Sequence, residues 1–209
     1  WRDAFQEEIA TCAGYLTVRC AGPRYFWPAG KGDIRPMLQA LELDAKAQGK
    51  LISFDPNLRK PLWQNEAAAA EQIEWGLHQA DIVKISDEEV DFLWHTTPAA
   101  AAQKLLREYG VRLVYVTMGP RGCYFANHSG SGTTACPTGI HVLDTTGAGD
   151  IFGGSAVSRL LKTGKAPEEL STEELGFIGQ FACTAASIST TQSGGIPSIP
   201  EEGAVLARM

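Results

Sequence analysis

The sequence predicts an α/β fold, a three-layer sandwich in which helices cover a mainly parallel central sheet. Short apolar runs alternate with segments whose apolar residues recur at helical spacing, in units of about 30 residues. This alternation is typical of βαβ units, because two parallel strands need a crossover helix between them. A hydrophobic fraction of 44% and a charged fraction of 20% exclude a disordered chain and a coiled coil.

The first half of the chain contains two clear strands, each preceded by a helix. Apolar residues at helical spacing predict helices over residues 38–45 and 70–77, and Gly49 is a stop signal after the first. Short apolar runs at 51–54 and 82–85 predict the strands.

The middle of the chain continues the pattern and then breaks it. Thr97 as N-cap and the proline after it predict a helix that ends near residue 109, followed by a strand over 113–117. The Gly-Pro-Arg-Gly turn at 119–122 predicts an antiparallel return into a strand at 123–126. The Gly, Ser and Thr residues of 127–134 predict an exposed loop.

Two helices are predicted to close the chain. One begins at Asp150, and the other spans 178–185, after which the glycines and prolines of 193–200 end the regular structure. Near the start, a strand is expected around 15–18, and the aromatic stretch 25–28 is loop-like.

Charge and hydropathy exclude several kinds of partner. The net charge of −6 argues against nucleic acid. No apolar run approaches the ~18 residues of a membrane helix. The chain starts at Trp1, with Arg2 and Asp3 following, and shows no signal peptide. We therefore expect a cytoplasmic protein that binds neither nucleic acid nor membranes.

The five cysteines fit neither a disulfide framework nor a zinc site, since their number is odd and no C-x-x-C occurs. Such usage suits a reducing compartment. We interpret the cysteines as small buried hydrophobic residues rather than as redox or metal sites.

A glycine-rich run at 144–154, DTTGAGDIFGG, carries the strongest chemical signal. Gly147 and Gly149 lie immediately before a predicted helix, where unpaired amides and the helix dipole attract an anion such as phosphate. Asp150 at that place would repel a phosphate, unless it accepts a proton from a hydroxyl that attacks the phosphate. The alternative is structural, because Asp stabilises helix starts and glycines often precede helices. The whole run favours the catalytic interpretation.

This run resembles the C-terminal signature of the ribokinase/PfkB family of sugar kinases. Four further stretches resemble the family in the family's order: 52–59 with 62–63, 81–90, 116–123 and 194–200, and the first two closely resemble its fructokinase branch. The resemblance covers the chain from about residue 34 to the end. Ordered motifs are more specific than any one of them. No Gly-x-x-x-x-Gly-Lys-[Ser/Thr] occurs, so the chain is not a P-loop enzyme.

The resemblance implies transfer of the γ-phosphoryl group of ATP to a primary hydroxyl of a sugar, with fructose as the expected acceptor. It implies Mg²⁺, together with a monovalent cation such as K⁺, and Asp150 as the catalytic base. The anion hole would consist of consecutive backbone amides, those of Gly147, Ala148, Gly149 and Asp150. Another ketose, a sugar acid or ribose is the alternative acceptor.

Ser86 and Glu89 have two interpretations. In the family, a Glu organises Mg²⁺ through water, and a polar residue lies three positions before it. This pattern would give Glu89 a metal-linked role and Ser86 a role in nucleotide binding. The alternative is a capping box, and the same Ser-x-x-Glu spacing recurs at Ser171 and Glu174 without any family role. The position after a predicted strand favours function.

Two further groups follow predicted strands. Asn57 and Arg59 would contact phosphate or substrate, or else belong to a turn built by Asp-Pro-Asn. By resemblance, Thr117, Gly119 and Gly122 contact the nucleotide, although the same residues suit a hairpin turn. Cys183 would line the pocket near the adenine.

The resemblance implies an incomplete domain. A complete member has about 100 further residues before the matched region, with more strands, a Gly-Gly motif, a sugar-binding aspartate and a β lid. We expect residues 1–209 to form one ribokinase-like kinase domain truncated at its N-terminus, in which 1–33 match weakly and 34–209 hold the nucleotide-binding and catalytic part. An uncovered sheet edge would favour self-association, for example as a homodimer.

Two functions of different classes remain. One is a sugar kinase whose partners are ATP and a small sugar. The other is a nucleotide-binding or structural remnant of a kinase without turnover. The intact run at 147–150 favours the first, and the missing sugar-binding region favours the second for this polypeptide alone.

Overall fold

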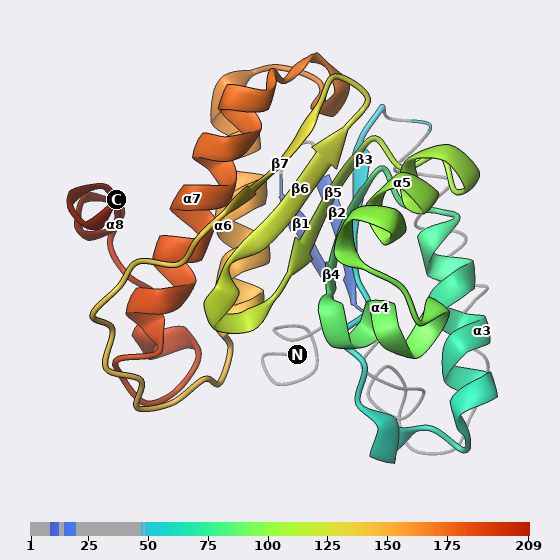
Figure 1. The fold of residues 1–209 in the computed structure, drawn as a ribbon, viewed down its shortest axis with the longest axis horizontal. Helices are drawn as coiled ribbons and strands as arrows, with labels where there is room; N and C mark the ends of the chain where they lie inside the picture. The colour runs from blue at the N-terminus through green and yellow to red at the C-terminus, as the bar shows by residue number, and fades with distance from the viewer. Residues whose placement is uncertain (1–8, 13–14, 20–46, 48) are drawn as a thin grey trace. The chain divides into compact units, whose positions relative to one another are not determined.

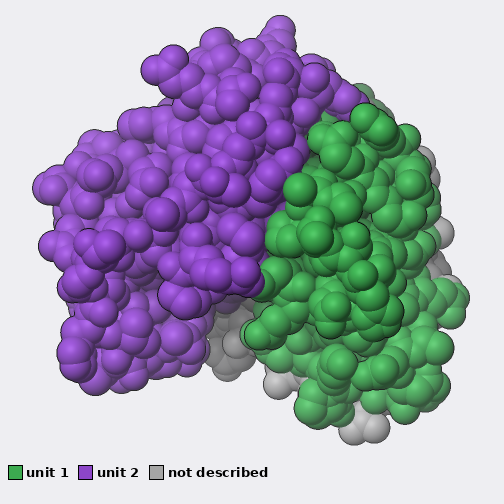
Figure 2. All heavy atoms as spheres, viewed as in Figure 1, with its two compact units in different colours: residues 1–114 green, residues 115–209 purple. Residues whose placement is uncertain are grey.

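The computed structural model describes residues 9–12, 15–19, 47 and 49–209. They divide into two compact units, residues 1–114 and 115–209, which Figure 2 colours separately. The predicted helix over 38–45 and the aromatic stretch 25–28 lie outside the described residues, whereas Gly49 and Lys50 are described. Among the described helices, none has the length and apolar character needed to cross a bilayer.

Unit 1 contains four neighbouring strands that confirm the α/β fold (Figure 1). They are β1 (Ile9–Cys12), β2 (Tyr15–Arg19), β3 (Leu51–Asp55) and β4 (Ile82–Ser86). β1 and β2 are antiparallel, whereas β2–β3 and β3–β4 are parallel, with Ser53 opposite both Thr17 and Ile82. The strands predicted around 15–18, 51–54 and 82–85 are therefore confirmed.

Helices connect β3 to β4 and follow β4, as the alternating pattern predicts. They are α3 (Glu66–Leu77), α4 (Asp87–Trp94) and α5 (Pro98–Glu108), with a short 3₁₀ turn, η1 (Lys60–Leu62), before α3. The Thr97 hydroxyl accepts the Ala100 amide at 3.2 Å and begins α5 as expected. Phe54 of β3, Ile73 of α3 and Leu105 of α5 are buried in the core.

Strand β5 (Leu113–Thr117) runs across the boundary between the units, and an antiparallel hairpin follows in unit 2. After the turn η2 (Gly119–Arg121), β6 (Cys123–Asn127) pairs with β7 (Ser131–Thr134). The loop predicted over 127–134 is thus wrong for its second half. The Asn127 carboxamide oxygen accepts the amides of Ser129 and Gly130, at 2.9 and 3.0 Å, and this tight turn returns the chain alongside β6.

Two long helices, α6 (Ala148–Thr163) and α7 (Thr172–Ser189), pack against each other in unit 2 (Figure 1). The 3₁₀ turn η3 (Pro167–Glu169) connects them. Helix α6 starts two residues before the predicted Asp150. Its Phe152 ring meets the Tyr115 ring edge-on, with 5.7 Å between centroids.

The regular structure does not end at the C-terminal prolines, contrary to the sequence prediction. A turn, η4 (Ile196–Ser198), leads into helix α8 (Glu202–Arg208). Seven residues are too few for a stable isolated helix. Arg159 and Lys162 of α6 hold the Glu202 carboxylate at 2.7 and 2.6 Å, and Val205 is buried in a cluster with residues of α6 and α7. Tertiary contacts therefore form this helix.

Candidate functional site

In unit 1, the ends of β3 and β4 bring two opposite charges together. The Lys84 ammonium lies 3.3 and 3.2 Å from the two carboxylate oxygens of Asp55, and both side chains are only about a tenth exposed. Asp55 also accepts the Asn57 amide at 3.1 Å, and Asn57 has a left-handed backbone with φ +45°. The predicted Asp-Pro-Asn turn therefore forms, and it presents Asn57 beside a buried ion pair.

Glu89 lies at the start of α4, and its carboxylate joins two segments. One oxygen accepts the Ser86 amide at 2.8 Å, while the Ser86 hydroxyl accepts the Glu89 amide at 3.2 Å, which completes a capping box. The other oxygen accepts the Leu58 amide at 2.7 Å, from the turn after β3. Glu89 is 7% exposed. The capping interpretation is therefore correct, and the Leu58 contact adds a tertiary role to it.

The pair Ser171 and Glu174 forms the same capping box in a different setting. The Ser171 amide donates to a Glu174 carboxylate oxygen at 2.9 Å, and the Glu174 amide donates to the Ser171 hydroxyl at 3.2 Å. The free oxygen of Glu174 accepts Lys165 at 2.6 Å near the surface, which lowers the pKa of Glu174. Burial, followed by the nearby negative charge of Asp55, raises the pKa of Glu89. The same capping motif thus holds one carboxylate with a raised pKa, Glu89, and one with a lowered pKa, Glu174.

We expect this raised pKa to appear in the pH dependence of stability. The folded state holds the Glu89 proton more tightly than the unfolded state, so the Glu89 contribution is fully present below the ordinary pKa of 4.5 and falls as pH rises through the folded pKa. Glu89→Gln cannot titrate. Urea unfolding of both proteins from pH 4 to 8 should give a stability difference, wild type minus variant, that declines with pH. A constant or rising difference contradicts this expectation, and Glu174→Gln should show the opposite slope.

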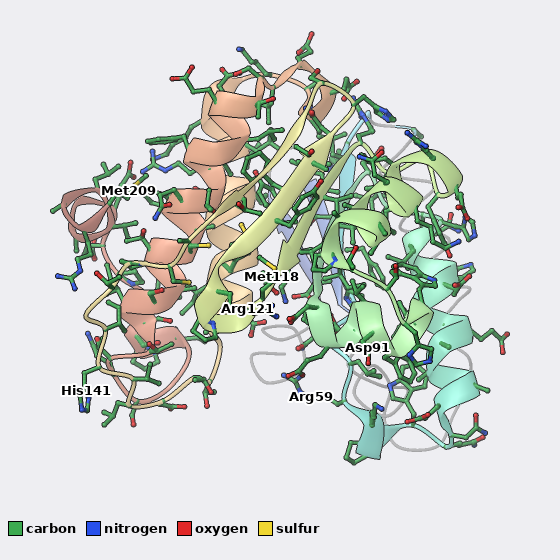
Figure 3. All side chains as sticks on the ribbon, in the orientation of Figure 1. Arg59, Asp91, Met118, Arg121, His141 and Met209 are labelled. Atoms are coloured by element: carbon green, nitrogen blue, oxygen red, sulfur yellow. The ribbon has the colours of Figure 1, made fainter. Side chains whose placement is uncertain are left out.

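Arg59 follows the same turn and lies at the surface (Figure 3). Its guanidinium donates to the Leu58 carbonyl at 3.4 Å. Because Leu58 also donates its amide to Glu89, the segment that carries Arg59 is fixed to the start of α4. Among the predicted residues, Asn57, Arg59, Ser86 and Glu89 thus lie along one connected network of unit 1.

In unit 2, Asp144 holds the glycine-rich run in place. Its carboxylate accepts the Thr146 amide at 2.8 Å and the Gly194 amide at 2.9 Å, fifty residues later. The Gly194 amide, followed by the hydroxyl and amide of Thr146, lowers the pKa of Asp144 to about 2. Sequence reasoning assigned Asp144 no separate role. Its position at the start of the glycine-rich run was the one feature of the sequence that pointed to it, because its partner Gly194 is distant in the sequence.

Gly147 forms the N-cap of α6 with φ +79°, a conformation that favours glycine. A Cβ atom at this position would lie 3.0 Å from the Gly195 Cα. The Ile151 amide donates to the Gly147 carbonyl at 2.9 Å, and the Ala148 amide donates to Thr145 at 3.2 Å. The start of α6 therefore has no side chain at its N-cap, and the positive end of the helix dipole lies there.

Asp150 is the third residue of α6, and its side chain is exposed. It shares the first turn of the helix with Ala148 and Gly149. The start of a helix attracts anions, so a carboxylate at the same place is suited to hold a hydroxyl next to a bound phosphate.

The turn after β5 carries the remaining predicted residues. The Met118 amide donates to the Gly122 carbonyl at 2.8 Å, and the Gly122 amide donates to the Gly119 carbonyl at 3.1 Å. These backbone hydrogen bonds form the predicted turn. Met118 and Arg121 mark this turn in Figure 3. Thr117 ends β5.

Cys183 is buried on α7, where the Thr134 hydroxyl lies 3.7 Å from its sulfur. Within the described ranges, no group of three or more His, Cys, Asp or Glu residues is arranged to hold a metal ion. Asp55 and Glu89 nevertheless supply the carboxylate oxygens that Mg²⁺ prefers.

Comparison with known proteins finds fructokinases among the relatives of this chain. Fructokinase-1 of Zea mays is 39% identical over 173 residues, which are 81% of this chain and 51% of that protein. Fructokinase-2 of Solanum lycopersicum is 35% identical over 166 residues, which are 78% of this chain and 49% of that protein. The chain thus spans about half the length of the curated relatives it matches.

Solved structures agree with this comparison. A fructokinase from Xylella fastidiosa with bound ATP has a TM-score of 0.79 at 25% identity, covering 93% of this chain and 61% of that one. A fructokinase from Vibrio cholerae O395 with fructose, ADP and calcium has a TM-score of 0.74 at 25% identity, with 93% and 60% covered. The model of the pfkB family carbohydrate kinases matches residues 31–202. With most of its length matched, the chain belongs to the pfkB family of carbohydrate kinases.

Proposed function

We propose that this chain carries the nucleotide-binding and catalytic part of an ATP-dependent sugar kinase, which phosphorylates a primary hydroxyl of a sugar. The observation that carries the proposal is the start of α6, where Gly147 exposes backbone amides and Asp150 occupies the same turn. Fructose is the first candidate acceptor, because the curated relatives compared above are fructokinases and one related structure contains fructose with ADP. Another ketose, a sugar acid or ribose would offer the same hydroxyl chemistry.

In this proposal, Asp150 accepts the proton of the sugar hydroxyl as that oxygen attacks the γ-phosphorus. The amides of the first α6 turn, from Gly147 to Asp150, stabilise the negative charge of the transferring group. The Ala148 amide donates to Thr145 in this structure, so it serves the phosphate only after that bond opens. Asp144 keeps the run in its conformation by holding the Gly194 amide.

The unit 1 network would serve the metal and the phosphates. Mg²⁺, when bound, supplies positive charge to the ATP phosphates. Each Glu89 oxygen already accepts one amide, which leaves a lone pair on each for a metal-bound water. Ser86 fixes Glu89 through the capping box, and Asn57 and Arg59 would contact phosphate or substrate.

The nucleotide would lie along unit 2. Thr117, Gly119 and Gly122 would contact it at the turn after β5, and Cys183, which is buried on α7, would line the pocket near the adenine. A monovalent cation such as K⁺ is proposed as a further cofactor. We propose that the two units act as one kinase domain, that the protein works in the cytoplasm, and that an uncovered sheet edge favours self-association.

A second candidate function is nucleotide binding without turnover. It is favoured by the extent of the match, which covers only about half of the curated relatives. ATP binding by itself therefore does not distinguish the two functions, whereas phosphoryl transfer to a sugar does.

We expect the 209-residue chain to bind ADP or ATP with Mg²⁺, with a dissociation constant of about 0.1–1 mM. The residues proposed for the nucleotide all lie in the described part of the chain. Isothermal titration calorimetry with and without Mg²⁺ measures this affinity. Glu89→Gln should make the nucleotide affinity less dependent on Mg²⁺, whereas the matched capping-box variant Glu174→Gln should not. No measurable heat from a folded chain would refute the proposed nucleotide site.

A further inference from the structure

Lys84 places a positive charge inside the sheet of unit 1. It lies in β4 between the buried residues Val83 and Ile85, and only 11% of its side chain is exposed. An ammonium group loses most of its hydration at such a place, which is costly unless nearby groups compensate for the loss. The role proposed above for Glu89 does not by itself require a cation at this position, so Lys84 needs a separate explanation.

The register of the sheet fixes the partner of Lys84. Strands β3 and β4 are parallel, with Phe54 opposite Val83. One residue further along both strands, this register places Asp55 opposite Lys84, and residues opposite each other on neighbouring strands point to the same face of the sheet. The Lys84 ammonium accordingly lies 3.3 and 3.2 Å from the two carboxylate oxygens of Asp55. Backbone pairing therefore sets this ion pair.

The ammonium of Lys84 contacts both oxygens of Asp55 at once. Mg²⁺ and Mn²⁺ bind carboxylates through these same atoms. One of the two oxygens also accepts the Asn57 amide at 3.1 Å, and Asp55 as a whole is 7% exposed, so the protein leaves little further access to the carboxylate. Lys84 thus occupies the side of Asp55 that a divalent cation would need.

A second carboxylate lies beside this ion pair. Asp55 accepts the amide of Asn57, and Glu89 accepts the amide of the next residue, Leu58, at 2.7 Å. Because consecutive Cα atoms are only about 3.8 Å apart, the two carboxylates flank the same turn. Burial raises the pKa of Glu89, the charge of Asp55 raises it further, and the charge of Lys84 lowers it, which agrees with this closeness. Without Lys84, the two ionised carboxylates would attract a divalent cation.

We propose that Lys84 is a positioning residue whose ammonium takes the place of a divalent cation on Asp55, so that Mg²⁺ binds beside Glu89 only together with the nucleotide. The second half of this inference rests on the proposed function. When all three side chains are ionised, two carboxylates and one ammonium leave a single net negative charge, which holds a free divalent cation weakly. The phosphates of the nucleotide supply the negative charge that is missing.

The test is to titrate the 209-residue chain with Mn²⁺ at pH 8 without nucleotide and to follow free Mn²⁺ by electron paramagnetic resonance. We expect the wild type to bind Mn²⁺ with a dissociation constant of about 1 mM or weaker. Lys84→Met removes the charge and keeps an unbranched side chain, so the affinity for Mn²⁺ should rise about tenfold or more. Lys84→Gln should have the same effect. Its amide can still donate to Asp55, which provides a second variant if the first fails to fold.

Two controls locate the gained affinity. Adding Asp55→Asn to Lys84→Met removes one of the two carboxylates and should return the affinity for Mn²⁺ to that of the wild type. Lys165→Met is the matched control near the surface, because Lys165 lies 2.6 Å from Glu174, which forms the same capping box as Glu89. This variant should leave Mn²⁺ binding unchanged. An equal gain in the Lys165 variant would mean that any lost positive charge suffices, and the proposal would be wrong.

Lys84 variants that fold and gain no affinity for Mn²⁺ would overturn the proposal. So would a wild-type chain that binds Mn²⁺ without nucleotide more tightly than about 0.1 mM, a result that needs no variant.

Calorimetry with ADP is a separate measurement of the link to the nucleotide. At limiting Mg²⁺, Lys84→Gln should bind ADP about fivefold more weakly than the wild type, because uncompensated carboxylates then face the phosphates. At saturating Mg²⁺ the two affinities should agree within about twofold, since the cation replaces the lost charge. An equal loss at both Mg²⁺ concentrations would refute the link. Failure of the wild type to bind ADP would count against the proposed function and leave the Mn²⁺ result standing.

Discussion

Replacing Asp150 with asparagine should lower kcat by about 10²–10⁴, while the affinity for nucleotide changes by a few-fold or less. Asparagine has the same shape and keeps polar atoms in the first turn of α6, but it is a far weaker base for a sugar hydroxyl. We expect the loss of a negative charge near the γ-phosphate to favour ATP slightly, because like charges repel. The measurement is kcat with the nucleotide dissociation constant, in a polypeptide of the relatives' full length that carries residues 1–209.

The matched control is Glu173→Gln in α7. Glu173 is an exposed acid in the first turn of a helix, as Asp150 is, so both variants lose the same kind of interaction with a helix dipole. The control should leave kcat unchanged. If Asp150→Asn also keeps kcat within a few-fold of the parent, Asp150 only stabilises the helix start, and its proposed role as base is wrong.

Gly147→Ala should abolish most nucleotide binding and destabilise the protein. The alanine must adopt φ +79°, which costs about 1–2 kcal/mol for a residue with a Cβ. Its Cβ would also meet the Gly195 backbone at 3.0 Å, so the two segments must separate. Because Asp144 joins these same segments through Gly194, the displacement should reach the amides proposed to hold phosphate. Urea unfolding and calorimetry with ADP measure the two effects.

Gly164 provides a matched control at the other end of the same helix. It is the C-cap of α6 with φ +67°, and nothing lies within 4 Å of an added Cβ. Gly164→Ala should therefore show the conformational cost of about 1–2 kcal/mol without any loss of ADP affinity. Equal losses of affinity in both variants would mean that stability alone explains the effect, and the role of Gly147 at the phosphate would be refuted.

Much of the local structure was predictable, because the sequence places strong local signals at each element. Thr97 caps α5 and Pro98 begins it, and the apolar runs at 51–54 and 82–85 are strands, as predicted. Strand β7 and helix α8 were missed. Polar, glycine-rich β7 forms because β6 lies beside it, and α8 forms because ion pairs to Arg159 and Lys162 hold Glu202. Those contacts come from residues that no local window contains.

The candidate site shows the same division. The glycine-rich run indicated a helix start with an acid in its first turn, but its attachment to Gly194 through Asp144 was not visible. The scattered cysteines gave no sign that Cys123 and Cys183 both lie at the Thr134 hydroxyl. Sequence spacing describes neighbours along the chain, whereas these contacts depend on how α7 packs against the β6–β7 hairpin.

The two Ser-x-x-Glu motifs show most directly what each level decides. The sequence by itself indicated a capping box at both, because the interaction needs only four consecutive residues, and both form one. Only the tertiary structure decided that Glu89 is buried beside Asp55 with an amide from Leu58, while Glu174 meets Lys165 near the surface. The pKa of a carboxylate depends on the water and charge around it, and the fold supplies both from residues far along the chain.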